Sequence, residues 1–236
     1  LIENVPRFLK MYFPYKDNLK NIKEIILNKF NDRYNIEINL LDAKDYGVAQ
    51  TRPRAIIKMY KKNLTWDFPD KKEEVSLKQA IGHLPSLEPG QKSTIPWHYA
   101  RKHIKSHIIW MKHTPTGKSA VENKIHYPRK DDGTKIKGYN SSYRRIKWDE
   151  PSPAITIRND AISSQRNVHP GRKKADGTYS DPRVLTPLEI IILFSLPQKW
   201  KIPANTPEIL IRQCIGEAVP PLLIKKVLAP ILKNET

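Results

Sequence analysis

Residues 1–60 predict an α/β fold, and three stretches within them carry that prediction. Residues 18–30 repeat apolar side chains at helical spacing, with lysine and glutamate opposite, which indicates an amphipathic helix. Residues 36–40 alternate apolar and polar side chains as a half-buried strand does, and residues 55–60 form an apolar, β-branched run. A helix followed by two strands is typical of the closing part of a doubly wound sheet.

The stretch Leu-Ile-Glu-Asn-Val-Pro at residues 1–6 places a carboxylate and an amide directly after an apolar pair. We expect it to be the carboxyl end of a buried strand, where α/β enzymes commonly place their chemistry. Arg52 and Arg54 stand two positions apart at the start of the second predicted strand, so their side chains should share a face. Two fixed positive charges could therefore face the ligand that Glu3 handles.

Changes in local composition and in the periodicity of apolar residues divide the chain into three parts. Residues 1–75 contain the predicted sheet. Residues 76–182 begin with a short capped helix and then become rich in prolines and turn signals, including Asp-Gly turns at residues 132–133 and 176–177. We expect a small, irregular, mostly β domain there. Residues 183–236 become helical again, with helices predicted at 187–194, 207–216 and 221–228.

The chain is strongly basic. Lysine and arginine total 42 against 24 acidic residues, which gives a net charge of +18 and a pI near 9.8. Residues 76–182 carry 20 of the basic residues against nine acids, so +11 of the +18 lies there. Such a surplus indicates a polyanionic partner, with a merely solvated basic surface as the alternative.

The cysteine content and hydropathy exclude several classes of protein. One cysteine, Cys214, rules out an internal disulfide framework and a cysteine-based zinc site, and it favours a reducing compartment. No apolar run approaches the ~18–20 residues of a membrane-spanning helix, and no signal peptide opens the chain. The sequence therefore predicts a soluble, cytoplasmic protein with no membrane partner.

Four motifs, in this order along the chain, resemble those of the DNA cytosine-5 methyltransferases. Residues 3–5 match the family's Glu-Asn-Val motif, and residues 50–54, Gln-Thr-Arg-Pro-Arg, match its Gln-x-Arg-x-Arg motif. Residues 183–189 resemble Arg-x-Leu-Thr-x-x-Glu, and residues 216–221, Gly-Glu-Ala-Val-Pro-Pro, resemble the closing Gly-Asn-Ala-Val-Pro-Pro motif. Any one motif alone is weak evidence, but four in the family's order point to one family.

The resemblance implies the carboxyl-terminal part of an S-adenosylmethionine-dependent, Rossmann-like methyltransferase sheet, plus a target-recognition domain in residues 76–182. The implied reaction is methyl transfer to C5 of a flipped-out cytosine in duplex DNA, in a bacterial enzyme of restriction-modification or orphan type. The family's Phe-x-Gly-x-Gly cofactor loop and Pro-Cys-Gln nucleophile loop are not in the sequence. We therefore expect an incomplete cofactor pocket, no activity alone, and a missing amino-terminal half as partner.

The resemblance also assigns catalytic roles. Thiolate addition to cytosine C6 develops charge on the ring, and Glu3 would meet it at N3 as a general acid. Asn4 would brace the site through backbone contacts. Arg52 and Arg54 would meet negative charge at O2, at the adjacent phosphate and on Glu3, because a guanidinium forks onto paired acceptors. The structural alternatives are a strand-end glutamate in a cap or ion pair and two exposed edge arginines.

The cofactor and DNA contacts come from the later motifs. Glu217 and Ala218 of the closing motif would touch the cofactor's amino acid end, although Glu217 replaces the family's asparagine. Residues 151–156 resemble a run that precedes the family's recognition loops. The predicted DNA contacts come from side chains that can bind base edges or phosphates: Gln50, Arg144, Arg145, Thr156, Arg158, Gln165 and Arg166. Gln50 could alternatively form hydrogen bonds within its own loop.

Three alternatives remain. The chain could be a DNA-binding module without catalysis, although a pure binder would not need Glu3, Arg52 and Arg54. It could also be an RNA cytosine methyltransferase of similar fold. Finally, a group of histidines lies near two tryptophans, and we interpret it as basic surface and core packing rather than as a metal site: His98, His103, His107 and His113.

Overall fold

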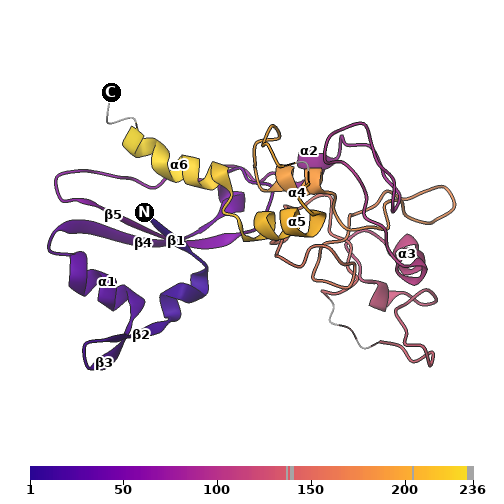
Figure 1. Cartoon of the computed structure of the whole chain (residues 1–236), viewed down its shortest axis with the longest axis horizontal. Helices are drawn as coiled ribbons and strands as arrows, with labels where there is room; N and C mark the ends of the chain where they lie inside the picture. The colour runs from indigo at the N-terminus through magenta and orange to yellow at the C-terminus, as the bar shows by residue number, and fades with distance from the viewer. Residues whose placement is uncertain (137, 139–140, 204, 233–236) are drawn as a thin grey trace.

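A three-stranded antiparallel sheet organises the start of the chain (Figure 1). The computed structural model describes residues 1–136, 138, 141–203 and 205–232. The sheet order is β1-β5-β4, from strands β1 (Ile2–Asn4), β5 (Pro53–Lys61) and β4 (Tyr34–Asp42). The strands predicted at residues 36–40 and 55–60 are confirmed, each slightly longer than its apolar pattern. The first strand, expected to be buried, is β1, which is half-buried at an edge of the described sheet. β5 is central, so it pairs with a neighbour along both edges.

Helices cover both faces of this sheet, as Figure 1 shows, with α6 (Pro221–Leu232) on one side and α1 (Ile22–Phe30) on the other. Successive β5 residues point to opposite faces. Ile57 packs with the α1 face, whereas Ile56 packs against α6. The α/β class is therefore confirmed. We call residues 1–75 together with α6 the sheet unit, and residues 76–217 the loop-rich unit.

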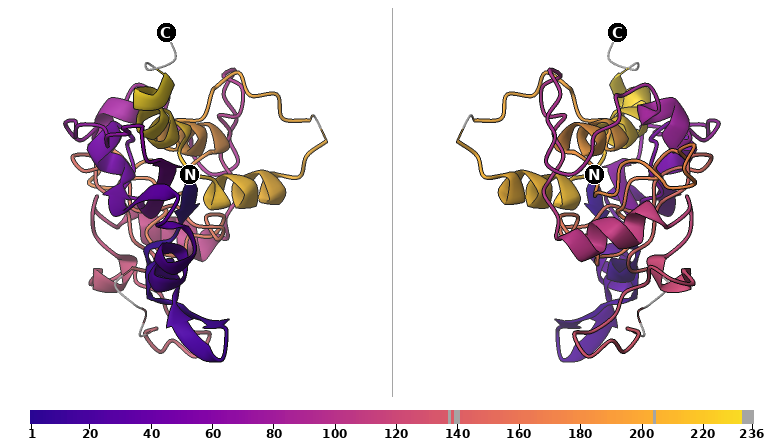
Figure 2. Two further views of the ribbon diagram at one scale, coloured as in Figure 1. Left: turned by 90° about the vertical axis from the view of Figure 1, so that its left-hand side faces the viewer. Right: turned by 90° about the vertical axis from the view of Figure 1, so that its right-hand side faces the viewer.

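The predicted helix at residues 18–30 begins four residues too early. Residues 18–21 form strand β3 (Asn18–Asn21), which pairs with β2 (Tyr12–Tyr15) in a hairpin that follows the 3-10 turn η1 (Pro6–Lys10). Leu19, which completed the helical pattern, is 69% exposed on that hairpin. The Asn21 side chain accepts from the Lys23 amide and so caps α1 there. Figure 2 shows the hairpin projecting below the sheet.

The loop-rich unit is not mostly β, so that prediction was wrong. Its described residues form no paired strands, only isolated bridges, along with α2 (Leu77–Ile81), α3 (Lys105–Lys112) and the 3-10 turn η3 (Ala120–Glu122). The sequence did not predict α3. Both Asp-Gly turns are confirmed, because Gly133 and Gly177 adopt φ of 82° and 80°, where glycine is favoured.

The later helices are divided between the two units. Helices α4 (Pro187–Leu193) and α5 (Glu208–Glu217) pack with α2 in an apolar core of the loop-rich unit. Only α6 returns to the sheet, where Leu223 and Val227 are fully buried. Capping boxes at Ser76 and Thr186 begin α2 and α4. The three predicted helices are therefore confirmed, although α6 extends past residue 228.

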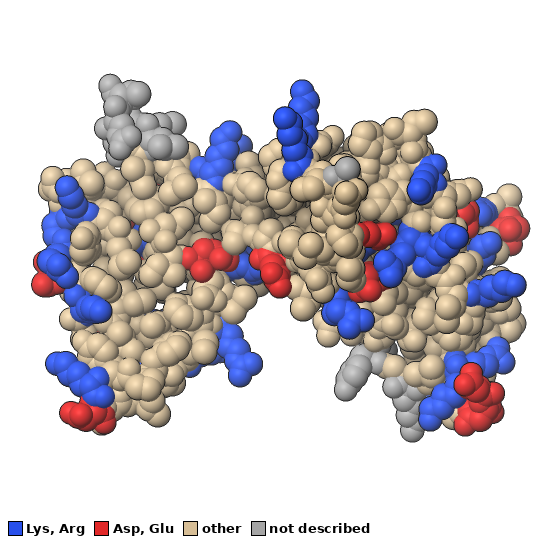
Figure 3. Space-filling model, in the orientation of Figure 1, with Lys and Arg blue, Asp and Glu red and all other residues tan. Residues whose placement is uncertain are grey.

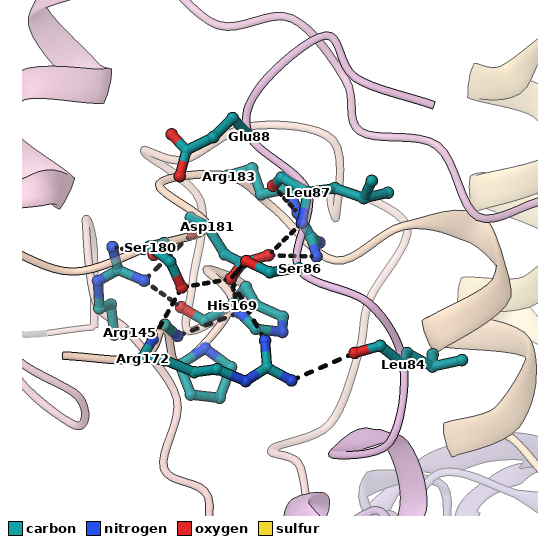
Figure 4. A network of polar contacts seen from close by, with 12 residues as sticks. Leu84, Ser86, Leu87, Glu88, Arg145, His169, Arg172, Ser180, Asp181 and Arg183 are labelled. Atoms are coloured by element: carbon teal, nitrogen blue, oxygen red, sulfur yellow. Dashed lines mark hydrogen bonds and ion pairs between the residues drawn. The ribbon is translucent and has the colours of Figure 1, made fainter. Parts of the chain in front are cut away.

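Buried arginines hold the loop-rich unit together (Figure 4). Arg183 donates to both carboxylate oxygens of Glu189, at 2.8 and 2.9 Å, and to Asp181 at 2.9 Å. Arg145 is 0% exposed and donates to backbone carbonyls of Met111, Ser180 and two further residues. Buried charges are tolerated only when paired in this way, so removing one partner leaves the others uncompensated.

His169 lies inside this network between two carboxylates. Its Nδ1 accepts from the Gly171 amide, so the ring proton sits on Nε2, which is 3.7 Å from a Glu189 oxygen. Burial, followed by the charge of Arg183, lowers the pKa of His169 to about 3. Burial alone would raise the pKa of Glu189, but Arg183 outweighs it and lowers that pKa to about 2. The histidine is therefore neutral and the glutamate ionised near pH 7.

We expect stability to fall between pH 7.5 and pH 5.5. In this window His169 takes up a proton in the unfolded chain, near its ordinary pKa of 6.5, but not in the folded one. Since the unfolded state then binds more protons, acid favours it, by about 1.4 kcal/mol for one such histidine. Urea unfolding at several pH values should show that His169→Gln removes this part of the pH dependence of the free energy of unfolding. The exposed His83→Gln should keep it, and equal pH slopes for the two variants would contradict this account.

Candidate active site

Glu3 and Arg54 meet on one face of the sheet. Glu3 pairs with Ile56 across β1 and β5, so Arg54 lies diagonally opposite and on the same face. The Arg54 Nε and Glu3 Oε1 atoms are 2.6 Å apart, and the two side chains are 11% and 21% exposed. No N–H among the described residues is aligned on Oε1 as a hydrogen bond. The carboxylate is therefore held in place by charge while this oxygen lacks an aligned donor.

Asn4 is used locally, since its side-chain oxygen accepts from the Val5 amide at 2.8 Å. This contact fixes the turn where the chain leaves β1 and enters η1. The role of Asn4 in bracing the site through backbone contacts remains a prediction.

Arg52 points away from Glu3, contrary to the expectation that it shares a ligand with Arg54. It precedes the first residue of β5, so the alternation of a strand does not govern it. Its guanidinium donates to the Ile155 carbonyl at 2.9 Å and to those of Gly216 and Ala218 at 2.7 and 2.9 Å. Burial, followed by the charge of Arg54, lowers its pKa to about 10, so it stays charged near neutral pH.

Gln50 is also internal. It is fully buried, its Oε1 accepts from the Ile155 amide, and its Nε2 donates to the Leu193 carbonyl. Its neighbour Thr51 donates to Ser152. Gln50 therefore makes no DNA contact in this arrangement, and the alternative, that it serves its own surroundings, fits the structure. Residues 49–52 of the sheet unit thus bind the loop-rich unit, and we call this contact the junction.

The closing motif lies at the carboxyl end of α5, against the carbonyl of Thr156. A Cβ atom on Gly216 would lie 2.6 Å from that carbonyl oxygen, which explains glycine at this position. Glu217 is exposed, whereas the half-buried Ala218 has its carbonyl engaged by Arg52. A cation at a helix carboxyl end also stabilises the helix dipole. Of the predicted cofactor residues, only Glu217 thus keeps a polar side chain free of the junction.

The family model described as C-5 cytosine-specific DNA methylase matches residues 1–233. The chain belongs to this family. It is 59% identical over 234 residues to the type II methyltransferase M1.HgaI of Avibacterium volantium, covering 99% of this chain and 66% of the relative. It is 29% identical over 205 residues to the type II methyltransferase M1.HphI of Haemophilus parahaemolyticus, covering 86% and 49%. The chain thus spans about half to two thirds of the length of these two relatives.

Solved structures support the same fold. A prophage-encoded protein of E. coli, described as a DNA modification methyltransferase, matches with a TM-score of 0.65 at 19% identity, over 98% of this chain and 68% of its own. A mutant of Spodoptera frugiperda DNMT2 matches with a TM-score of 0.56 at 14% identity, over 98% and 65%. At such identities the likeness shows the fold alone.

The remaining DNA candidates of this methylase chain divide by exposure. Arg145 is wholly buried and bonded to carbonyls, so its predicted role as a DNA contact was wrong. Arg144 is partly buried and donates to Gly117 and Glu122. Arg158, by contrast, is 70% exposed. It belongs to the set of exposed candidates that a DNA duplex could reach: Thr156, Arg158, Gln165 and Arg166.

The histidines are dispersed among different contacts. His98 is buried between Thr186 and the Pro85 carbonyl, and His113 stacks on His126. In the part of the chain that the structure describes, no three His, Cys, Asp or Glu side chains are grouped to hold a metal ion. Over the same residues, no helix is long and apolar enough to span a membrane.

Two features of the methylase chain were not predicted from its sequence. Arg183 and Glu189 were noticed as a motif, but their buried ion pair was not foreseen. An arginine six residues before a capping-box glutamate was the available signal. His103 and His107 were interpreted only as basic surface and core packing, although residues 101–104 and His107 line a pocket together with Asp160. Its dense mixture of arginine, lysine and histidine was visible in the sequence.

We expect Arg52→Lys to destabilise the protein by about 1–3 kcal/mol, because a compact ammonium lacks the planar fork that reaches all three carbonyls, and buried acceptors then lose their donors. Urea or thermal unfolding measures this change. The matched control is Arg7→Lys on the exposed surface, which should stay within about 0.5 kcal/mol of the wild type. Equal stability of the two variants would show that Arg52 does not hold the junction.

Proposed function

We propose that this chain is the cytosine-handling and DNA-recognising part of a type II DNA cytosine-5 methyltransferase of restriction-modification systems. The observation that carries the proposal is the Glu3–Arg54 pair at the end of β1, in a chain that belongs to the cytosine-5 methylase family. The sheet would be the carboxyl-terminal portion of a larger Rossmann-like sheet. The loop-rich unit would be its target-recognition domain.

The substrate is a cytosine flipped out of duplex DNA, because C6 is hidden from a nucleophile inside the stack. Thiolate addition to C6 places negative charge on the ring, and a proton or hydrogen bond at N3 stabilises it. Glu3 supplies that contact when protonated, since its side chain is 21% exposed while Arg54 holds its Oε1 atom. Arg54 fixes the carboxyl group and donates to the cytosine O2.

Arg52 acts on the reaction without contacting the base. Its three carbonyl contacts tie residue 155 of the loop-rich unit and the end of α5 to the strand that carries Arg54. A flipped base must reach Glu3 while the duplex remains on the loop-rich unit, so the relative position of the two units controls the reaction geometry. We assign Arg52 as a positioning residue.

The residues present fit one wall of an S-adenosylmethionine site. Glu217 is exposed beside the junction, and its carboxylate can accept from the ammonium of an amino acid group. The carbonyls of Gly216 and Ala218 are already occupied by Arg52, so they contribute shape rather than acceptors. When bound, S-adenosylmethionine supplies the electrophilic methyl group.

The nucleophilic thiol is assigned to a protein segment outside these 236 residues. Cys214 is exposed on α5 and lines an apolar pocket with Trp200, Ile202 and Leu210 rather than the face that holds Glu3. Nearby cationic groups are what activate a cysteine, and this apolar lining provides few. The chain also covers only 66% of its M1.HgaI relative. The proposed partner is a segment that carries the thiol and the main cofactor loop.

The duplex is proposed to lie against the loop-rich unit. Figure 3 shows a notch in the lower outline between the two units, with lysine and arginine side chains at its sides and acidic side chains above it. The exposed candidates Arg158 and Arg166 belong to the same loop-rich unit, which also carries most of the net charge. Arginine suits both phosphates and guanine edges, so these residues could serve either.

We expect Glu3→Gln to slow methyl transfer by roughly 10²–10⁴-fold while leaving DNA affinity largely intact, because the amide cannot donate a proton. The assay follows labelled methyl transfer to cytosine C5, with the chain joined to the remaining part of the M1.HgaI relative. Glu24→Gln, on the exposed side of α1, is the control and should keep full activity. Unchanged turnover of Glu3→Gln would make Glu3 a structural residue.

The unjoined chain should be inactive in this assay, since it lacks the proposed thiol. Methylation by the purified 236-residue chain alone, persisting in Cys214→Ser, would show that the reaction proceeds by another mechanism.

Duplex DNA binding by the chain should weaken steeply as salt rises, because phosphate contacts dominate such binding. Replacing Arg158 and Arg166 by alanine should reduce the slope of log K against log salt by about 0.9 per lost phosphate contact. Lys61→Ala with Lys62→Ala, at the far end of β5, removes the same charge and should leave the slope unchanged. Binding indifferent to salt would contradict the proposed DNA face.

A further inference from the structure

A pocket outside the predicted recognition loops lies between the run that leads into α3 and residues 160–162. It has a volume of about 460 Å³ and opens broadly to solvent. We call it the 101–107 pocket. Two cations, two imidazoles and one carboxylate give its lining a polar character: Arg101, Lys102, His103, His107 and Asp160.

The floor of the 101–107 pocket is fixed by packing. Ile162 is fully buried in an apolar cluster with Trp110 and Val184. The His107 ring lies against the rings of Trp110 and Tyr143, with centroid distances of 5.2 and 5.4 Å. These contacts hold the wall and floor without any ligand, so the pocket is preformed.

The two cations of the pocket are only weakly compensated by the protein. The carboxylate paired with Arg101 is Glu208, at 3.8 Å, and the same Glu208 oxygen accepts from Arg212 at 2.6 Å. Lys102 is exposed and has no ion pair among the described residues. By contrast, Arg183 in the buried network binds two carboxylates at 2.8–2.9 Å. Arg101 and Lys102 can therefore bind an external anion without first breaking strong contacts.

His103 adds a neutral donor to this lining. Its Nε2 accepts from the Val184 amide at 3.4 Å, which places the ring proton on Nδ1. Burial, followed by the charge of His107, lowers the pKa of His103 to about 4, so the ring remains neutral near pH 7. A neutral N–H group beside two cations is a lining that anions prefer.

The pocket adjoins the exposed stretch of candidate DNA contacts. Arg158 pairs with Asp160 of the pocket wall, with Nε and Oδ1 3.4 Å apart, and this pair offsets the carboxylate in the lining. Thr156 and Arg158 are both exposed. A nucleic acid strand bound to Arg158 would therefore lie close to the 101–107 pocket, whose cations suit its repeating phosphates.

We propose that the 101–107 pocket binds a backbone phosphate of duplex DNA, outside the target cytosine. An open, cationic lining with N–H donors suits a phosphate, which positions DNA without reading its sequence. A site for a flipped base would instead be enclosed and would present matched donors and acceptors. This inference rests on the proposed function, because it takes DNA as the ligand.

The first test is the salt dependence of DNA binding by the chain carrying both Arg101→Ala and Lys102→Ala. Losing this contact should reduce the slope of log K against log salt by about 0.9 or more, with weaker binding at low salt. Lys61→Ala with Lys62→Ala is the matched control, because it removes the same charge from an exposed turn of the sheet unit. Equal slopes for the two double variants would overturn the assignment.

A second test locates the phosphate. Duplexes that each carry one neutral methylphosphonate linkage are bound to the wild-type chain and to the Arg101→Ala, Lys102→Ala variant. Neutralising one particular linkage should weaken DNA binding by the wild-type chain. The same change should cause no further loss of DNA affinity in the variant, which already lacks the contact. If every linkage weakens both proteins equally, the pocket holds no phosphate of the duplex.

Inorganic phosphate tests the other source of the same chemistry. Should it bind the pocket while the double substitution leaves DNA binding unchanged, the site is a small-anion pocket and the proposal fails. Salt-independent DNA binding by the wild-type chain would defeat the proposed function itself, whereas salt-dependent binding with unchanged double variants would defeat the pocket assignment only.

Discussion

Buried arginine side chains do in the loop-rich unit what strand pairing does in a sheet. Buried backbone carbonyls need donors, and the described residues of this unit form no strand ladder to provide them. A guanidinium carries five N–H groups in a rigid fork, so one side chain can serve several carbonyls. Arg145 and Arg212 do so within the unit, and Arg52 does so across the junction.

This use of arginine changes how the basic composition relates to DNA binding. Part of the surplus positive charge of residues 76–182 is buried and bound to other groups of the protein, as Arg145 shows. The charges available to a polyanion are those in exposed or weakly paired positions, such as Arg158 and Lys102. Net charge therefore indicated the class of partner, whereas burial decides which residues meet it.

Local patterns predicted those features that depend on neighbouring residues. The capping boxes, the strands with alternating or apolar runs and the Asp-Gly turns follow from interactions a few residues apart. The family resemblance placed Glu3 near Arg54, whereas the β1–β5 register that brings them together comes from the structure. Arg52 and Gln50 were not, since their partners lie more than 100 residues away, at Ile155 and Gly216. Leu19 misled because its apolar spacing fits a helix while its real setting is a hairpin.

The return of α6 to the sheet sets an order of maturation during synthesis. Ile56 and Tyr46 face α6, so that side of the sheet stays uncovered until residues 221–232 have left the ribosome. The core of the loop-rich unit, by contrast, ends with α5 and is complete earlier. Within these 236 residues, the strands of the sheet precede the loop-rich unit but complete their packing after it. Their apolar face is the surface that a nascent chain must protect from aggregation or hand to a chaperone.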